Sequence, residues 1–261
     1  MSESGRSLIE VPAGGRLFEG HFPGRPILPG VAQIGLVLAA MSAGRGPWPE
    51  LSEIISMRLR RLVGPGDRLE LGLAERPDRR VRLTLERDGV VVTQGEFRLG
   101  PARPAVESGR ALQDEASVRP LPVEQLLPHR PPMRLLERLV AIAPRGLRAT
   151  ARVPAGCGLV HAGRAHGSVA IEAAAQAAAA WEAALRAGGA GGAEPRVGYL
   201  VAIREVEFGT AEIPVDCPFD VAVHLRDAEL PLSRYDFEAA REGRVLARGQ
   251  IATMLAGPEP D

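Results

Sequence analysis

Residues 18–33 read FEGHFPGRPILPGVAQ, a loop rich in proline and glycine that runs into an almost wholly apolar segment. Its three prolines and three glycines predict an irregular loop with restricted backbone freedom. Apolar residues then follow nearly without a break over residues 31–42, which predicts a helix enclosed by other structure. Pro29 and Gly30 stand where the loop gives way to this helix.

Two residues of this loop suit acid–base chemistry at a carbonyl group. The first N–H groups of a helix lack partners and carry the positive end of its dipole. The N–H of Gly30 is therefore a candidate for stabilising a carbonyl oxygen that gains negative charge, with Pro29 as a supporting residue. His21 is a candidate base because the pKa of imidazole lies near neutrality. From the residues alone, however, a histidine that only hydrogen-bonds its own loop is the favoured reading.

Working outward from this loop, the chain divides into two halves with the same order of elements. The segment 101–118 has no sustained apolar period and is predicted to be a linker. In the first half, alternating patterns predict strands at 7–12, 54–62, 68–74, 80–87 and 90–99, with a hairpin turn at Asp88-Gly89. In the second half, they predict strands at 134–143, 147–153, 197–208, 218–226, 233–240 and 243–254. An alanine-rich helix is predicted at 168–186. Duplication of one unit explains this order, with domains at 1–100 and 119–258.

Composition excludes several classes of function. The 261 residues are 45% hydrophobic and 25% charged, which is usual for a soluble globular protein of one large or two small domains. The 32 basic and 32 acidic residues cancel, which argues against a basic face for nucleic acid. Cys157 and Cys217 cannot build a disulfide scaffold, the N-terminus lacks a signal-peptide pattern, and the apolar runs 31–41 and 169–181 are too short to span a membrane. We therefore expect a cytoplasmic protein.

Several motifs resemble one enzyme family. HFPGRPILPGVAQ (residues 21–33) closely resembles the active-site segment of the 3-hydroxyacyl-[acyl carrier protein] dehydratases, and VGPGD (63–67) resembles a later segment of that family. In the second half, LPHRPPM (127–133), IEAAAQ (171–176) and RVGYL (196–200) resemble the same superfamily. The two halves look most like the two small dehydratase-like proteins of aryl polyene clusters. The resemblance implies the hot-dog fold, in which an antiparallel sheet wraps one central helix.

The resemblance also implies a shared active site. The family pairs a histidine with a carboxylate fourteen positions later, and in its symmetric dimers the two come from different subunits. The first half has His21 but Gly35 at the acid position. The second half has Glu172 but Gly158 at the histidine position. We therefore expect an α+β protein of two tandem hot-dog domains packed as an internal pseudo-dimer, with one composite site and one inactive mirror site.

The expected reaction is loss of water from a 3-hydroxyacyl thioester. His21 would remove the C2 proton, while the N–H of Gly30, or of Gly167 as its second-half equivalent, would stabilise the enolate-like oxygen. Glu172 stands among apolar residues, so we expect a raised pKa and a protonated carboxyl that donates to the leaving hydroxyl. Gln176 would orient Glu172. The alanine run 173–180 suits either a close-packed helix or an acyl-chain tunnel.

Other residues carry alternatives. Cys157, His161 and His166 lie close in sequence, but a zinc site needs three or four ligands with conventional spacing, so we expect no metal. His161 or His166 could instead replace His21 as the base of the second half. His129 lies in a proline-rich segment and is expected to be structural.

Exposed arginines offer a partner surface. Arg58, Arg60 and Arg61 alternate with apolar residues, which is typical of a solvated strand face. The functional alternative is docking of an acidic acyl carrier protein, for which Arg25 is a further candidate.

The sequence thus predicts a dehydratase without metal or redox cofactor, acting on carrier-protein-bound chains. The alternatives are a hot-dog thioesterase in which Glu172 activates water and His21 is dispensable, and a non-catalytic acyl-binding scaffold. Two hot-dog units already form a pseudo-dimer, so the sequence is compatible with a monomer and with a larger homo-oligomer.

Overall fold

A computed structural model gives the fold for residues 6–42, 49–103, 107, 122–187 and 197–256. The first half contains β1 (Arg6–Glu10), α1 (Gly30–Ser42), β2 (Leu51–Leu59), β3 (Arg68–Arg76), β4 (Arg80–Arg87) and β5 (Val90–Leu99). The second half contains α2 (Val123–Leu126), β6 (Leu136–Ala143), β7 (Gly146–Arg152), β8 (Val160–His161), β9 (Arg164–His166), α3 (Val169–Ala187), β10 (Gly198–Phe208), β11 (Glu212–Ile213), β12 (Pro218–Glu229), β13 (Leu232–Arg241) and β14 (Arg244–Leu255).

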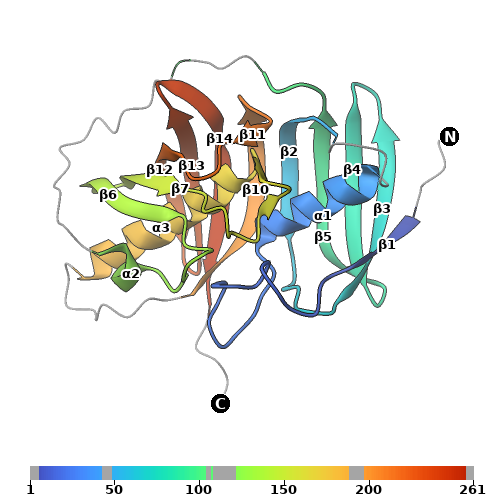
Figure 1. The fold of residues 1–261 in the computed structure, drawn as a ribbon, viewed down its shortest axis with the longest axis horizontal. Coiled ribbons are helices and arrows are strands. Elements are labelled where there is room, and N and C mark those ends of the chain that lie inside the picture. Colours follow the sequence, from blue (N-terminus) through green and yellow to red (C-terminus); the bar gives the residue numbers. More distant parts are fainter. Residues whose placement is uncertain (1–5, 43–48, 104–106, 108–121, 188–196, 257–261) are drawn as a thin grey trace.

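One antiparallel sheet runs through both halves (Figure 1). Its eleven strands follow the order β1-β3-β4-β5-β2-β10-β14-β13-β12-β7-β6. The halves join where β2 pairs with β10, with Ile54 opposite Val206 and Met57 opposite Ile203. The short strands β11, β9 and β8 form a separate three-stranded sheet. The second domain therefore continues the first through main-chain hydrogen bonds.

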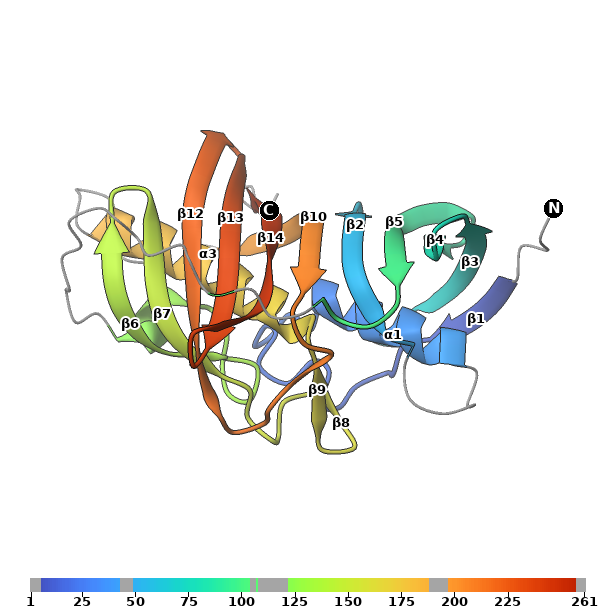
Figure 2. The same ribbon diagram turned by 90° about the horizontal axis from the view of Figure 1, so that it is seen from above.

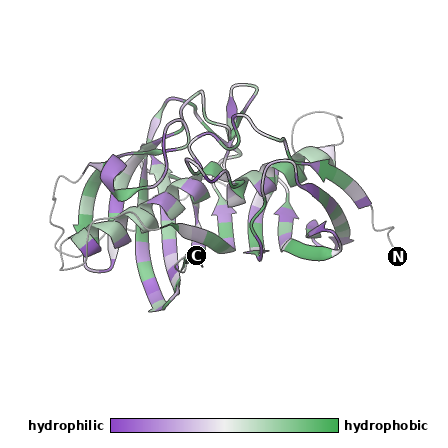
Figure 3. Ribbon diagram, turned by 90° about the horizontal axis from the view of Figure 1, so that it is seen from below, coloured by the Kyte–Doolittle hydropathy of each residue, from purple (hydrophilic) through white to green (hydrophobic). Residues whose placement is uncertain are grey.

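The two long helices lie on the same face of this sheet (Figures 1 and 2). Along the strands, hydrophobic and hydrophilic residues alternate (Figure 3), because only one face packs on the helices. On β3, for example, Leu69 and Leu71 are fully buried while Arg68 and Glu70 are exposed.

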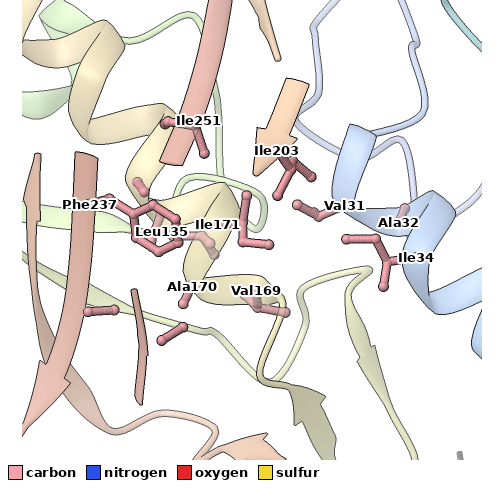
Figure 4. Packing of buried hydrophobic residues seen from close by; sticks show 14 of the residues in the cluster. Val31, Ala32, Ile34, Leu135, Val169, Ala170, Ile171, Ile203, Phe237 and Ile251 are labelled. Carbon is pink, nitrogen blue, oxygen red and sulfur yellow. The ribbon is translucent and has the colours of Figure 1, made fainter. Parts of the chain in front are cut away.

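The beginnings of α1 and α3 meet at the centre of the molecule. Figure 4 shows Val31 and Ile34 of α1 near Val169 of α3, with Ile203 of β10 beside them. These residues are 0–2% exposed and belong to one continuous core. Because loop and helix-start residues carry the candidate chemistry, this packing brings the functional ends of the two halves together.

The secondary structure agrees closely with the sequence prediction. Both long helices begin and end within one residue of their expected bounds. The strand expected at 54–62 is shifted to Leu51–Leu59, so Arg60 and Arg61 follow the strand instead of lying on it. The short elements α2, β8, β9 and β11 were not expected from the sequence. Within the described residues, no helix is long and apolar enough to cross a membrane.

The linker expected at 101–118 lies mostly outside the described residues. The division into domains at 1–100 and 119–258 therefore stays a prediction.

Candidate active site

His21 is held in the loop before α1 with one ring nitrogen free to act as a base. Its Nδ1 lies 2.9 Å from the carbonyl oxygen of Ile27, and the Ile27 N–H donates back to the His21 carbonyl at 3.1 Å. A carbonyl can only accept, so Nδ1 carries the proton and Nε2 keeps its lone pair. Burial lowers the pKa of His21, partly offset by the charge of Glu172. The ring is therefore a neutral base near neutral pH.

Glu172 lies in the first turn of α3 and is 3% exposed. Its Oε1 accepts a hydrogen bond from Gln176 Nε2 at 3.0 Å. Gln176 is itself fixed, because its Nε2 donates to the Met133 carbonyl at 2.8 Å and its Oε1 accepts from the Leu135 N–H at 2.9 Å. The spacing of four residues on one helix face thus places the glutamine where the sequence predicted it, against the carboxylate.

His129 lies between these two groups, which the sequence did not indicate. Its Nε2 is 3.4 Å from Glu172 Oε1, and its ring centroid is 5.2 Å from that of His21. The residue is 6% exposed, and its Nδ1 is buried with no hydrogen-bond partner in the described part of the chain. The expectation of a purely structural His129 did not foresee this position. Its placement beside Glu172 depends on contacts between residues distant in sequence.

A close contact between the two halves places His129. The Arg130 N–H donates to the Gly20 carbonyl at 3.0 Å. A Cβ on Gly20 would lie 2.0 Å from the Arg130 carbonyl oxygen, and Gly20 has a φ of +80°. Only glycine allows both the conformation and the approach. The glycine before His21 therefore docks the first-half loop onto the segment that carries His129.

The protonation expected for Glu172 is wrong in this structure. Burial alone would raise the pKa of the carboxyl, as the sequence suggested. The hydrogen bond from His129, the charges that His21 and His129 carry when they are protonated, and the hydrogen bond from Gln176 outweigh burial and lower the pKa of the carboxyl. The apolar neighbours in sequence gave no sign of two imidazoles facing the carboxylate. These contacts therefore favour the carboxylate form of Glu172.

These groups open onto a cavity of about 470 Å³. His21, His129 and Glu172 line it, and Ala175 and Ala179 continue the lining along one face of α3. The other alanines of the run 173–180 are fully buried against the core. The close-packed reading therefore holds for most of this run, and an acyl-chain tunnel along Ala175 and Ala179 stays a prediction.

Of the two candidate oxyanion donors, only Gly30 is available. Gly30 begins α1, lines the cavity, and its N–H has no acceptor among the described residues. Pro29, directly before it, is buried and does not line the cavity. The N–H of Gly167 already donates to the Ala211 carbonyl at 2.8 Å, so the expectation for Gly167 is wrong. The acceptor lies just before β11, a strand that the sequence did not reveal.

Main-chain atoms of Arg16 fill the space at Gly158, the histidine position of the second half. A Cβ on Gly158 would lie 2.1 Å from the Arg16 carbonyl oxygen, so no side chain fits there. His166 Nδ1 bonds the Ser168 hydroxyl at 2.9 Å, and burial lowers the pKa of His166 to about 4. His161 is exposed. Neither histidine lines the cavity that holds Glu172.

The metal alternative also changes. Cys157, His161 and His166 do not form a group of potential ligands, whereas ligand atoms of His21, His129 and Glu172 lie within 4.8 Å of one another. This is the one such group among the described residues. Because His129 and Gln176 contact the Glu172 carboxylate and His21 bonds the Ile27 carbonyl, we interpret the cluster as acid–base groups.

The candidate docking arginines separate into two sets. Arg60 and Arg61 line the cavity, together with Arg87 and Arg186. Arg25 and Arg58 are exposed and do not line it.

Two protein-family models match this chain, one after the other along the sequence. The ApeP-like family, described as ApeP dehydratase, matches residues 121–259, and the ApeI-like family, described as ApeI dehydratase, matches residues 2–96.

Curated relatives are named 3-hydroxyacyl-[acyl-carrier-protein] dehydratase FabZ. The protein from Syntrophotalea carbinolica is 39% identical over 93 residues, which cover 31% of this chain and 63% of the relative. The protein from Paramagnetospirillum magneticum is 31% identical over 109 residues, covering 37% and 68%. The first of these relatives is thus matched over less than two thirds of its length.

Solved structures share the fold. A dehydratase domain of a trans-AT polyketide synthase from Brevibacillus brevis superposes with a TM-score of 0.73 at 16% identity, covering 97% of this chain and 94% of that one. The dehydratase domain of PpsC from Mycobacterium tuberculosis gives 0.67 at 16% identity, covering 96% and 93%. The predicted double hot-dog fold is thereby confirmed.

Proposed function

The chain belongs to the ApeP-like dehydratase family, and on that basis we propose that it removes water from 3-hydroxyacyl thioesters at one site shared by its two halves. The observation that carries this proposal is that His21 of the first half and Glu172 of the second face the same cavity. The matches of residues 2–96 and 121–259 to two dehydratase families support it.

We propose that His21 carries out the first step. Its neutral Nε2 accepts the C2 proton, while the free N–H of Gly30 donates to the thioester carbonyl oxygen as negative charge develops there. The C2–H electrons form the C2=C3 double bond as the C3–O bond breaks. We propose that the hydroxyl leaves as water by taking a proton from Glu172, which carries that proton in the substrate complex, while Gln176 fixes the carboxyl group. The reaction is redox-neutral, so we propose that it uses no redox cofactor or metal.

The substrate carrier follows from the mouth of the cavity. Arg60 and Arg61 provide positive charge where the phosphate of a phosphopantetheine arm and an acidic carrier protein would approach. The apolar lining by Leu59, Leu200 and Ala179 suits an acyl chain. We therefore propose acyl carrier protein as the partner in fatty acid or polyene-type biosynthesis. The two free cysteines fit a cytoplasmic location.

Turnover of a carrier-bound 3-hydroxyacyl chain by wild type, His21→Ala and Glu172→Gln tests this function. We expect wild type to form the 2-enoyl product, and both folded variants to lose about 100-fold or more of kcat. Release of free thiol that survives His21→Ala would indicate a thioesterase instead. Absence of both reactions in protein that binds the carrier would indicate a scaffold.

The docking residues have a matched control on the same stretch of chain. Replacing both Arg60 and Arg61 with alanine should raise KM for the carrier-bound substrate about tenfold, because both line the cavity. Arg58→Ala should leave KM unchanged, because Arg58 is exposed outside the cavity. Equal effects of all three substitutions would argue against docking at the cavity mouth.

A further inference from the structure

The cavity is also lined by a buried amide, that of Gln33, which the proposed reaction does not use. Gln33 lies near the beginning of α1, three residues after Gly30, and is 2% exposed. The hydroxyl of Thr93 donates to its Oε1 at 2.6 Å, and its Nε2 has no acceptor among the described residues. A buried donor without a partner is costly, so this amide is suited to a ligand that enters the cavity.

The contact with Thr93 determines which end of the amide faces the cavity. Thr93 lies on β5 and is fully buried, and its hydroxyl has no other partner in the described part of the chain. A buried hydroxyl needs an acceptor, and in a glutamine side chain only Oε1 can accept, since the nitrogen carries two N–H donors. Oε1 therefore faces Thr93, and the N–H donors of Nε2 remain available to a ligand.

Gln33 and Gly30 lie on one face of α1. They are three positions apart, so the backbone of Gln33 is about 4.5 Å further along the helix axis on the same side. Side chains of a helix tilt towards its N-terminus, which brings the Gln33 amide back towards Gly30. Both residues line the cavity. The amide therefore lies close to the N–H that is proposed to hold the thioester carbonyl.

The arginines at the mouth of the cavity are also close to Gln33. The carbonyl of Val92, next to Thr93 on β5, accepts hydrogen bonds from the N–H of Arg60 at 2.8 Å and from that of Arg61 at 3.3 Å. Both arginines line the cavity together with Gln33. Gln33 thus adjoins the proposed thioester site and the positive charge proposed to hold the phosphate of the arm.

We propose that Gln33 binds the first amide of the phosphopantetheine arm, through a hydrogen bond from Nε2 to the carbonyl oxygen of that amide. In the arm, a sulfur, two carbons and a nitrogen separate the thioester carbonyl from this second carbonyl. That short chain can span the step from Gly30 to Gln33. The inference rests on the proposed dehydratase function. It makes Gln33 a specificity-determining residue and Thr93 a positioning residue that orients it.

The test places one 3-hydroxyacyl group on three thiols of equal length. N-acetylcysteamine keeps the first amide of the arm. In the second thiol a CH2 group replaces the amide N–H, so that only the ketone carbonyl remains. Pentanethiol has neither group. Formation of the 2-enoyl thioester is measured with each of them and with a carrier-bound chain.

The variants separate the hydrogen bond from folding. Gln33→Met removes the donor at similar size but leaves the Thr93 hydroxyl without an acceptor. Gln33→Met combined with Thr93→Val removes both polar partners, which costs little when the shapes are kept. Gln94→Met is the matched control, because Gln94 lies on β5 beside Thr93 and does not line the cavity.

We expect wild type and Gln94→Met to prefer the amide and ketone thioesters over the pentanethiol ester by about tenfold in kcat/KM, the effect of one hydrogen bond. Both Gln33 variants should lose this preference and about tenfold on the carrier-bound chain. All the proteins should treat the pentanethiol ester within about threefold of wild type, which a merely structural role of Gln33 would not allow.

Several results would overturn the inference. They are equal use of the three thioesters by wild type, a preference that survives in both Gln33 variants, and an equal loss by both variants on all three thioesters. A preference for the amide but not for the ketone would also overturn it, because the arm N–H would then be recognised. Wild type that dehydrates neither these thioesters nor the carrier-bound chain would instead overturn the proposed dehydratase function.

Discussion

The two halves of the molecule carry a loop before a central helix, but they use it in opposite ways. In the first half the loop leaves the N–H of Gly30 free and presents His21 to the cavity. In the second half the N–H of Gly167 is bonded to the Ala211 carbonyl, and Gly158 lies against the Arg16 main chain. The difference shows that main-chain atoms fill the mirror position, and some of them belong to the loop that carries His21.

Because the two loops differ in this way, the cavity with His21 and Glu172 depends on contacts between the halves. Gly20 packs on Arg130, so the first-half loop meets the segment carrying His129. Arg16, earlier in the same loop, packs on Gly158. The absence of a side chain at Gly158 therefore leaves room for the main chain of Arg16. One asymmetric contact region replaces two equivalent sites.

The largest effect should come from adding one methyl group at Gly20. Gly20→Ala places a Cβ 2.0 Å from the Arg130 carbonyl oxygen, so the loop and the His129 segment must move apart. A displacement of about 1 Å can cost about 100-fold in rate, so we expect kcat/KM to fall by that order. The free energy of unfolding should fall by about 2–4 kcal/mol. Steady-state turnover and denaturant unfolding measure the two losses.

Gly24→Ala is the matched control for this prediction. Gly24 also has a positive φ, of +76°, but a Cβ there meets nothing within 4 Å. It should lose only about 1 kcal/mol through the left-handed backbone and keep its activity. If the two variants behave alike, the contact between the halves does not position the site.

The sequence predicted most of this comparison because the deciding signals are local. The loop of residues 18–33, the apolar helices and the fourteen-residue spacing from His21 to Gly35 all lie in short stretches. Placement of His21 and Glu172 in one cavity followed from the complementary losses at Gly35 and Gly158.

What the sequence did not predict depends on contacts between distant residues. His129 is 43 positions before Glu172 and lies outside any regular element, so no periodicity links them. The LPHRPPM segment (127–133) was a usable signal, since it carried the family resemblance. The lowered pKa of Glu172 was missed for the same reason, because burial can be predicted from neighbours in sequence but facing imidazoles cannot.

A smaller effect should appear in the pH dependence of stability, through His166 of the second half. Burial lowers the pKa of His166 from 6.5 to about 4, so the unfolded chain binds a proton in this range that the folded protein does not. The free energy of unfolding should therefore fall as pH drops from 6.5 towards 4, by about 3 kcal/mol from this residue. His166→Asn should flatten that fall, as followed by denaturant unfolding at each pH.

Two controls place this effect in the second half. His161→Gln should leave the fall between pH 6.5 and 4 in place, because that fall is attributed to His166. The acidic limb of kcat/KM should persist in His166→Asn, because the proposed base is His21, whose own pKa is lowered by burial. Loss of that limb in His166→Asn would instead assign the base to the second half.

The smallest expected effect tests whether the mirror site can be restored. A Cβ at Gly35 meets nothing within 4 Å, so Gly35→Glu should fold and return the missing acid to α1. We expect kcat to change by less than about twofold, since an unobstructed substitution away from the working site rarely matters more. In a His21→Ala background, Gly35→Glu should not restore dehydration activity. The acid gains no base, because the Arg16 main chain leaves no room for a histidine at Gly158. Recovered activity in this double variant would mean that the mirror site still holds a working base, and that the asymmetry lies in one residue rather than in the packing of the loop.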